Sequence, residues 1–139
     1  GVEHAGLLGR LAEALLSATE GDRTVTALVI LWASAILSAI IDNIPFVATM
    51  IPLIKNMGPS MGGNEALMPL WWALSLGACL GGNGTLVGAS ANLTVAGLAE
   101  RGGVPFKFLT YTKLAFPLML GSVAARVVAE SKVPVLVAR

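Results

Sequence analysis

The sequence predicts an all-α integral membrane protein built from a re-entrant helical hairpin, a broken transmembrane helix and further transmembrane helices. Three observations predict this fold class. The 139 residues are 55% hydrophobic and only 12% charged, whereas an average globular domain is roughly 25% charged. The charged residues gather in clusters that are separated by long uncharged runs. Two of these runs contain short polar segments rich in Gly, Asn or Pro, which are typical of helices interrupted at membrane depth.

The composition also argues against several other classes of protein. So few charges cannot give a small enzyme a wettable surface, so we do not expect an enzyme. The single Cys79 excludes an intrachain disulfide, and the net charge of +1 gives no basic surface for nucleic acid. The segment 82–88 misses the dinucleotide-binding spacing by one residue, and the chain has no phosphate-binding GKS or GKT loop. We therefore expect no cofactor other than Na⁺ or H⁺ as a coupling ion.

The uncharged runs and the loops between them divide the chain into four parts of one partial transmembrane domain. The leucines of the first part recur at helical spacing and predict an amphipathic helix near Leu7–Ala18. The last part contains Pro117 as an expected kink. The four parts are an amphipathic or terminal helix in 1–23, the re-entrant hairpin in 24–56, the broken helix in 66–99 and the last transmembrane helix in 106–128.

The hairpin is predicted from two uncharged runs on either side of Asp42 and Pro45. Each run is too short to cross a hydrocarbon core about 30 Å thick comfortably. A single continuous helix would place the Asp42 carboxylate in the middle of the membrane, which is costly. Because proline disfavours helix at the residue before it, we expect the tip of the hairpin at Asp42–Pro45. The Gly- and Pro-rich residues 57–65 are expected to form the loop that follows.

The two polar interruptions hold the candidate binding residues. A broken helix leaves backbone N–H and C=O groups free, so half-helix N-termini attract anions and exposed carbonyls coordinate cations. Asp42 supplies a titratable charge, and with Asn43 it is the candidate Na⁺ ligand pair. The full candidate set for ion or substrate binding is Asp42, Asn43, Asn83, Gly84, Thr85, Ser90 and Asn92. Two structural alternatives stay open: Asp42 as a helix N-cap, and the glycines of 77–88 as helix-packing residues.

These motifs resemble a known family. Asp42-Asn43-Ile44-Pro45, followed by Gly81-Gly82-Asn83-Gly84-Thr85 and the residues up to Asn92, is similar to the arsenite-permease and sodium–proton-antiporter branch of the ion transporter superfamily. That branch is citrate-transporter-like and includes NhaD-type antiporters and the pink-eyed-dilution protein. The resemblance implies that the hairpin tip meets the loop 82–92 at an ion and substrate site. Related dicarboxylate transporters carry Ser-Asn-Thr at the tip, so the Asp-Asn-Ile tip here argues against a dicarboxylate substrate.

Together the residues and the resemblance predict an ion-coupled secondary active transporter of a small inorganic ion, such as Na⁺/H⁺ or arsenite, working by alternating access. Two alternatives stay open: a non-transporting membrane scaffold, and a carrier of organic anions such as citrate. Because carriers usually have two matched halves, we expect this chain to be the C-terminal part of a larger transporter. We expect a multi-pass protein of the cell (inner) membrane. Its expected partners are the lipid bilayer, the missing N-terminal half and the small ion, and a homo-oligomer stays open.

Overall fold

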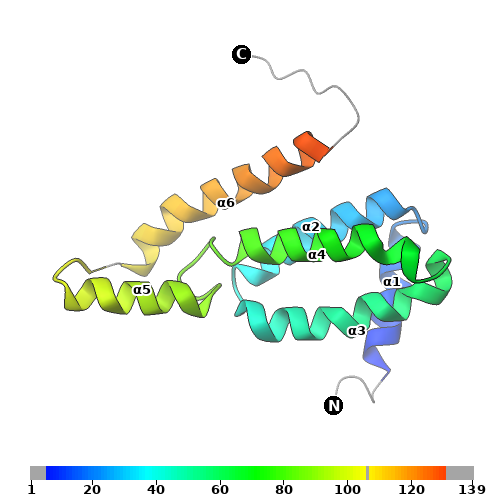
Figure 1. Ribbon diagram of the computed structural model, residues 1–139, viewed down its shortest axis with the longest axis horizontal. Helices are drawn as coiled ribbons and strands as arrows, with labels where there is room; N and C mark the ends of the chain where they lie inside the picture. The colour runs from blue at the N-terminus through cyan, green and yellow to red at the C-terminus, as the bar shows by residue number, and fades with distance from the viewer. Residues whose placement is uncertain (1–5, 106, 131–139) are drawn as a thin grey trace.

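Within residues 6–105 and 107–130, which the structure describes, the chain is helical throughout apart from its turns and loops (Figure 1). The structure is a computed structural model. In chain order the elements are α1 (Leu7–Ala18), α2 (Arg23–Ser38), α3 (Asn43–Met61), the 3₁₀ helix η1 (Asn64–Leu67), α4 (Met68–Gly81), α5 (Ser90–Arg101) and α6 (Phe108–Glu130).

Helix α1 occupies the range that the leucine spacing predicts, and a sharp turn separates it from α2. The turn passes through Gly21, whose φ of 69° lies in the left-handed region that glycine tolerates. Asp22 then caps α2, because its carboxylate accepts hydrogen bonds from the backbone N–H groups of Thr24 (2.8 Å) and Val25 (2.9 Å). The two helices are bent by 119°, so they do not form one straight span.

Helices α2 and α3 run in opposite directions and form a helical hairpin (Figure 1). The turn between them consists of residues 39–42, so the expected tip at Asp42–Pro45 is wrong by about three residues. Asn43 to Pro45 instead form the first turn of α3. Proline is tolerated in a first turn because the N–H that it lacks would have no partner within the helix.

Helix α3 also continues further than expected, through the first part of the predicted loop 57–65. It contains Pro52 and Pro59 and ends at Met61, and Gly62, with a φ of 93°, caps its C-terminus. Met57 and Met61 are both buried in the core. Burial of these side chains stabilises the last turns, so packing overrides the local preference of Gly58 and Pro59 for a turn.

The core centres on a close contact between α2 and α4. A Cβ atom at Gly77 would collide with the Leu31 carbonyl oxygen, and one at Gly81 would collide with Ala35. Glycine therefore lets the two helix backbones approach closely, the arrangement that small residues allow between membrane helices. The structural interpretation of the glycines, that they allow close helix packing, therefore holds for Gly77 and Gly81.

Helix α6 returns across α2 and α4 and is the strongest membrane-span candidate (Figure 1). Within the described residues, Phe108–Ala129 is the one helical stretch that is long and apolar enough to cross a bilayer alone, with 22 residues and a mean hydropathy of 1.3. Of the apolar α6 residues that the structure describes, only Met119 and Val123 are buried.

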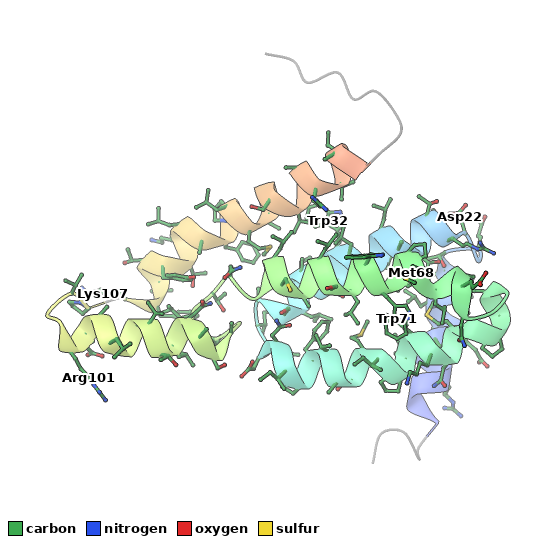
Figure 2. The ribbon with its side chains drawn as sticks, in the orientation of Figure 1. Asp22, Trp32, Met68, Trp71, Arg101 and Lys107 are labelled. Atoms are coloured by element: carbon green, nitrogen blue, oxygen red, sulfur yellow. The ribbon has the colours of Figure 1, made fainter. Side chains whose placement is uncertain are left out.

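Asp22 lies at one end of the molecule, whereas Arg101 and Lys107 lie at the other, where α5 meets α6 (Figure 2).

Candidate functional site

The two interruptions that the sequence predicts lie against each other. The first is the turn 39–42 between α2 and α3, and the second is the non-helical segment 82–89 between α4 and α5. The buried Thr85 hydroxyl donates a hydrogen bond to the carbonyl oxygen of Ala39. A Cβ atom placed on Gly88 would lie 2.8 Å from the Ser38 carbonyl oxygen. The segment 82–89 therefore packs directly on the end of α2.

The first break contains an ionisable side chain, that of Asp42. Asp42 is half-buried, and its Oδ1 accepts a long hydrogen bond (3.4 Å) from the backbone N–H of Ile44. The carboxylate thus acts as the N-cap of α3, as the structural alternative predicted. The next residue, Asn43, accepts a hydrogen bond from the Ser38 hydroxyl through its Oδ1 (3.4 Å). A capping carboxylate can also bind a cation, because capping occupies only part of its acceptor capacity.

Side-chain hydrogen bonds to the backbone hold the second break in shape. Besides its bond to Ala39, the Thr85 hydroxyl accepts a hydrogen bond from the Gly88 N–H (3.1 Å). From the first turn of α5, the Asn92 amide donates to the carbonyl oxygens of Gly82 (2.8 Å) and Thr85 (3.0 Å). Both ends of the loop are thereby tied to its middle.

The structure brings only some of the seven candidate residues together. Gly84 and Thr85 are buried against Ala39, and Asn92 reaches back to Thr85. Asn83 is exposed in the segment 82–89, and its amide donates back to the Cys79 carbonyl oxygen of α4 (3.1 Å).

The remaining candidates lie at the two helix N-termini that follow the breaks. Ser90 is exposed in the first turn of α5, where its carbonyl oxygen accepts from the Thr94 hydroxyl (3.1 Å). Asp42 and Asn43 begin α3. Within the described part of the chain, no hydrogen bond joins Asp42 directly to the segment 82–89.

Ser38, which the sequence pattern does not single out, connects three elements. This fully buried serine donates its one hydroxyl proton to the Ala78 carbonyl oxygen of α4 (3.0 Å), with Asn43 Oδ1 of α3 as a second, more distant acceptor (3.4 Å). A serine within an apolar run gives no signal of its own, because small polar residues are common in packed helices. The pattern does not single out Tyr111 of α6 either, although its hydroxyl donates to the Asn83 carbonyl oxygen (3.3 Å).

The chemistry of the site is that of oxygen ligands. Among the described residues, no group of three or more His, Cys, Asp or Glu side chains could hold a metal ion. The donors near the breaks are instead one carboxylate, amide oxygens and backbone carbonyls. Such oxygen donors suit hard cations rather than zinc or copper. The end of α2 places its partial negative charge at the same break as Asp42.

Comparison with known proteins places these features in a family. Residues 1–77 match the family model described as "Citrate transporter". The chain is 51% identical to the P protein of Mus musculus over 104 residues (74% of this chain, 12% of the relative). It is 49% identical to the P protein of Homo sapiens over 104 residues (74% of this chain, 12% of the relative).

A bacterial relative covers a similar part of the chain. An uncharacterised transporter of Mycobacterium tuberculosis is 47% identical over 108 residues (78% of this chain, 25% of the relative). The chain therefore spans only about an eighth of the P proteins and a quarter of this transporter. No solved structure matches the chain. Because the family model matches more than half of the 139 residues, the chain belongs to the citrate transporter family.

Proposed function

We propose that this chain forms part of an ion-coupled secondary active transporter that moves a small inorganic ion by alternating access. Membership in a transporter family makes the chain a membrane protein. The single observation that carries the proposal is the contact between the two helix breaks, made by Thr85, Gly88 and the end of α2. Carriers bind substrates and coupling ions where discontinuous helices meet, near the middle of the bilayer.

In this proposal α2 and α3 form a re-entrant hairpin whose turn reaches the interior of the membrane. Helix α2 has 16 residues and is roughly 24 Å long, short of a hydrocarbon core about 30 Å thick. A hairpin that enters and leaves by the same face needs no full crossing. Helices α4 and α5 would be the two halves of one broken span, and α6 a complete span of a multi-pass protein of the cell (inner) membrane.

Asp42 would bind Na⁺ or H⁺ as the coupling ion. An ionised carboxylate at membrane depth costs several kcal/mol unless it is paired, so binding a cation would lower the cost of moving the site. Asn43 is the next residue in the chain, and the carbonyls at the end of α2 belong to the same break; both are proposed as further ligands. From the second break, Asn83, Gly84, Thr85, Ser90 and Asn92 are proposed to complete the site through side-chain or backbone oxygens.

The second candidate function is the transport of an organic anion. It is favoured by the description of the matching family, which names citrate. The N-termini of α3 and α5 both follow a break, and helix N-termini attract anions. The Asp42 carboxylate argues against this alternative, because it would repel an anion unless a cation binds first. A third candidate, a scaffold that does not transport, would use the glycines for packing alone.

The test is the Asp42→Asn substitution in the full-length protein, reconstituted in proteoliposomes. Asparagine caps helices about as well as aspartate, so this change removes the charge and keeps the cap. We expect ion-coupled flux to be lost while membrane insertion and folding are retained. Asp22→Asn is the matched control, since Asp22 caps α2 far from the breaks, and its flux should equal that of the wild type.

The measurement compares uptake of isotopically labelled Na⁺, arsenite and citrate, each with and without opposing Na⁺ and pH gradients. Saturable flux that responds to the opposing gradient supports a carrier. Citrate uptake that exceeds inorganic ion flux would favour the second candidate, and no flux above that of empty liposomes would favour the scaffold. If Asp42→Asn leaves both flux and its pH dependence unchanged, the proposed role of Asp42 is wrong.

A further inference from the structure

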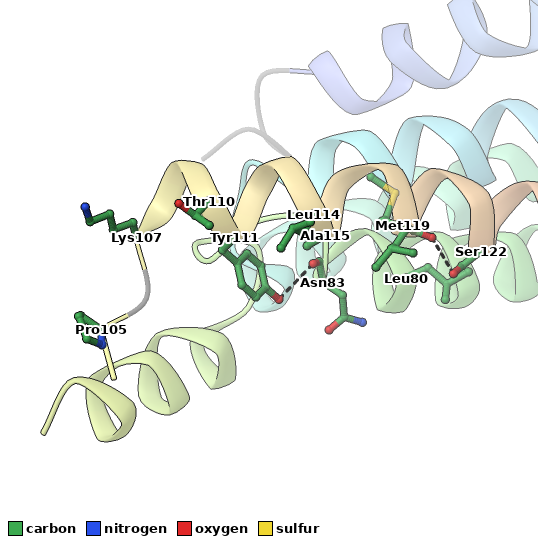
Figure 3. A pocket seen from close by; sticks show the side chains of 11 residues that line it. Leu80, Asn83, Pro105, Lys107, Thr110, Tyr111, Leu114, Ala115, Met119 and Ser122 are labelled. Carbon is green, nitrogen blue, oxygen red and sulfur yellow. Dashed lines mark hydrogen bonds between the residues drawn. The ribbon is translucent and has the colours of Figure 1, made fainter. Parts of the chain in front are cut away.

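A groove runs along α6, beside the end of α4, and its two ends differ in chemistry. Its volume is about 770 Å³. Its wall is mostly apolar and includes Leu80, Leu114, Leu118 and Met119, with Asn83 and Tyr111 beside them. Lys107 and Thr110 line one end, and Lys107 is the charged residue of the lining (Figure 3). Mostly apolar walls with a few polar groups are typical of ligand-binding pockets. The groove therefore offers an apolar length with a charge at one end.

The position of the groove on the candidate span sets its depth in a membrane. Lys107 lies immediately before Phe108, where the span Phe108–Ala129 begins. The lining residues of α6 extend from Lys107 to Ser122, a length of roughly 22 Å at 1.5 Å per residue. In a bilayer crossed by Phe108–Ala129, the charged end would lie at the membrane surface and the apolar part within the hydrocarbon region. Leu114 and Leu118 are 67% and 70% exposed, so the groove is open along its side.

We propose that this groove binds an anionic phospholipid. Its headgroup phosphate would pair with the Lys107 ammonium and accept a hydrogen bond from the Thr110 hydroxyl, and one acyl chain would lie along Leu114, Leu118 and Met119. Charge complementarity selects this occupant. A packed apolar helix would leave the Lys107 charge without a partner, and a small soluble anion would leave the apolar length empty. Basic residues at membrane surfaces bind anionic headgroups in this way.

The charges near the headgroup position favour an anion. Lys107 and Arg101 lie at the same end of the molecule (Figure 2), and Glu100, next to Arg101 at the end of α5, is the acidic residue there. Lys113 is an exposed residue of α6 that does not line the groove. It therefore provides a matched control with the same charge at a different position on the same helix.

The lipid would lie directly beside the second helix break. Tyr111 and Asn83 both line the groove, and the Tyr111 hydroxyl donates to the Asn83 carbonyl oxygen, which begins the non-helical segment (Figure 3). A bound acyl chain would pack against this pair and exclude water from its hydrogen bond. The inference therefore goes beyond ion transport: it assigns a lipid site that contacts the wall of the candidate site.

The experiment measures the binding of defined lipids to the full-length protein purified in detergent, by native mass spectrometry and by thermal unfolding. Dioleoyl phosphatidylglycerol is the anionic probe, and dioleoyl phosphatidylcholine and inorganic phosphate are the comparison probes. We expect the anionic lipid to bind more tightly than the zwitterionic lipid and to raise the Tm, and phosphate alone to have no effect. Lys107→Gln should weaken binding of the anionic lipid about fivefold, the effect of one basic residue near a membrane surface. Lys113→Gln should leave the affinity unchanged.

A second variant tests the apolar part of the groove. Leu118→Trp should fill the groove and reduce binding of the anionic lipid, and its Tm without lipid reports whether it folds. The proposal is wrong if Lys107→Gln binds this lipid as tightly as the wild type, or if Lys113→Gln weakens binding equally. Equal binding of both lipids would also overturn it, as would the same Tm shift with phosphate alone. These readouts need no ion flux, so they are independent of the proposed transport function.

Discussion

The two helix breaks that meet at the candidate site are held in different ways. At the turn 39–42 the Ile41 N–H donates to the Leu37 carbonyl oxygen (2.8 Å). The side-chain bonds that Asp42 accepts and that Ser38 donates to Asn43 are long (3.4 Å each). The segment 82–89 has backbone bonds too, but it is also held by Thr85 and Asn92, which each make two hydrogen bonds that fix its shape. The first break carries a carboxylate, and the second carries none.

Because of this difference, the polar residues of the two breaks have different roles, although the sequence does not distinguish them. The hydroxyl proton of Thr85 and the amide protons of Asn92 are already used by the protein's own carbonyl oxygens. Asp42 makes one long bond through Oδ1 and, in the described part of the chain, none through Oδ2. These protons hold the shape of the second break, so its oxygens are what it can offer to an ion, and the first break supplies the group best able to change its partner.

The strongest test of this comparison adds a methyl group where the two breaks touch. In Gly88→Ala the new Cβ would lie 2.8 Å from the carbonyl oxygens of both Gly82 and Ser38. These are backbone atoms, so the two breaks must move apart. Overpacking of this kind costs about 1–3 kcal/mol. We expect a lower Tm in detergent and the loss of flux in proteoliposomes.

Gly97→Ala is the control for this substitution. Gly97 lies within α5, and nothing lies within 4 Å of the position that its Cβ would occupy. Alanine is favoured over glycine inside a helix by roughly 0.5–1 kcal/mol, so the Tm should stay the same or rise. If Gly88→Ala were as stable and active as Gly97→Ala, the two breaks would not be in contact in the functional protein.

A smaller effect is expected from Thr85→Val, which keeps the side-chain shape and removes the hydroxyl. The Gly88 N–H and the Ala39 carbonyl oxygen would each lose a buried partner. An unsatisfied buried polar group costs about 1–3 kcal/mol, and the free energy of unfolding should fall by an amount in this range. Thr85→Ser should recover most of the loss, since it restores the hydroxyl.

Measuring the Tm decrease of Thr85→Val with and without Na⁺ distinguishes a structural role of Thr85 from a role as an ion ligand. If Thr85 only holds the shape of the second break, the decrease in Tm for Thr85→Val will be the same with and without Na⁺. If Na⁺ stabilises the wild type but not Thr85→Val, Thr85 is an ion ligand. The second break would then contribute to ion binding, as proposed, as well as to the shape of the site.

The sequence predicts the helices better than their ends. Periodicity and charge spacing predict a helix at Leu7–Ala18, which α1 occupies, and polar composition predicts both breaks. The tip was placed too late because Pro45 was interpreted as a helix breaker, although proline fits the first turn of α3. The predicted loop 57–65 begins too early in the chain, because α3 continues to Met61. The burial of Met57 and Met61 depends on tertiary contacts, which local composition does not reveal.

The candidate site shows the same limit. The residue types at the breaks are visible in the sequence, but their hydrogen-bond partners are not. Ser38 lies in an apolar run, and its bond to the Ala78 carbonyl oxygen joins residues 40 positions apart. That pairing exists only because Gly77 and Gly81 let α2 and α4 approach closely. Sequence reasoning finds the polar residues, whereas the packing of the helices decides which of them meet.

The smallest expected effect comes from the contact between α6 and the second break. Tyr111→Phe removes the hydroxyl that donates to the Asn83 carbonyl oxygen at 3.3 Å. This bond is long and exposed, so water can replace it, and the free energy of unfolding should fall by only about 0.5 kcal/mol. Ser122→Ala is the control, because that hydroxyl on the same helix donates to Leu118 within α6. A loss for Tyr111→Phe as large as that for Thr85→Val would mean that α6 holds the second break as firmly as the loop's own side chains do.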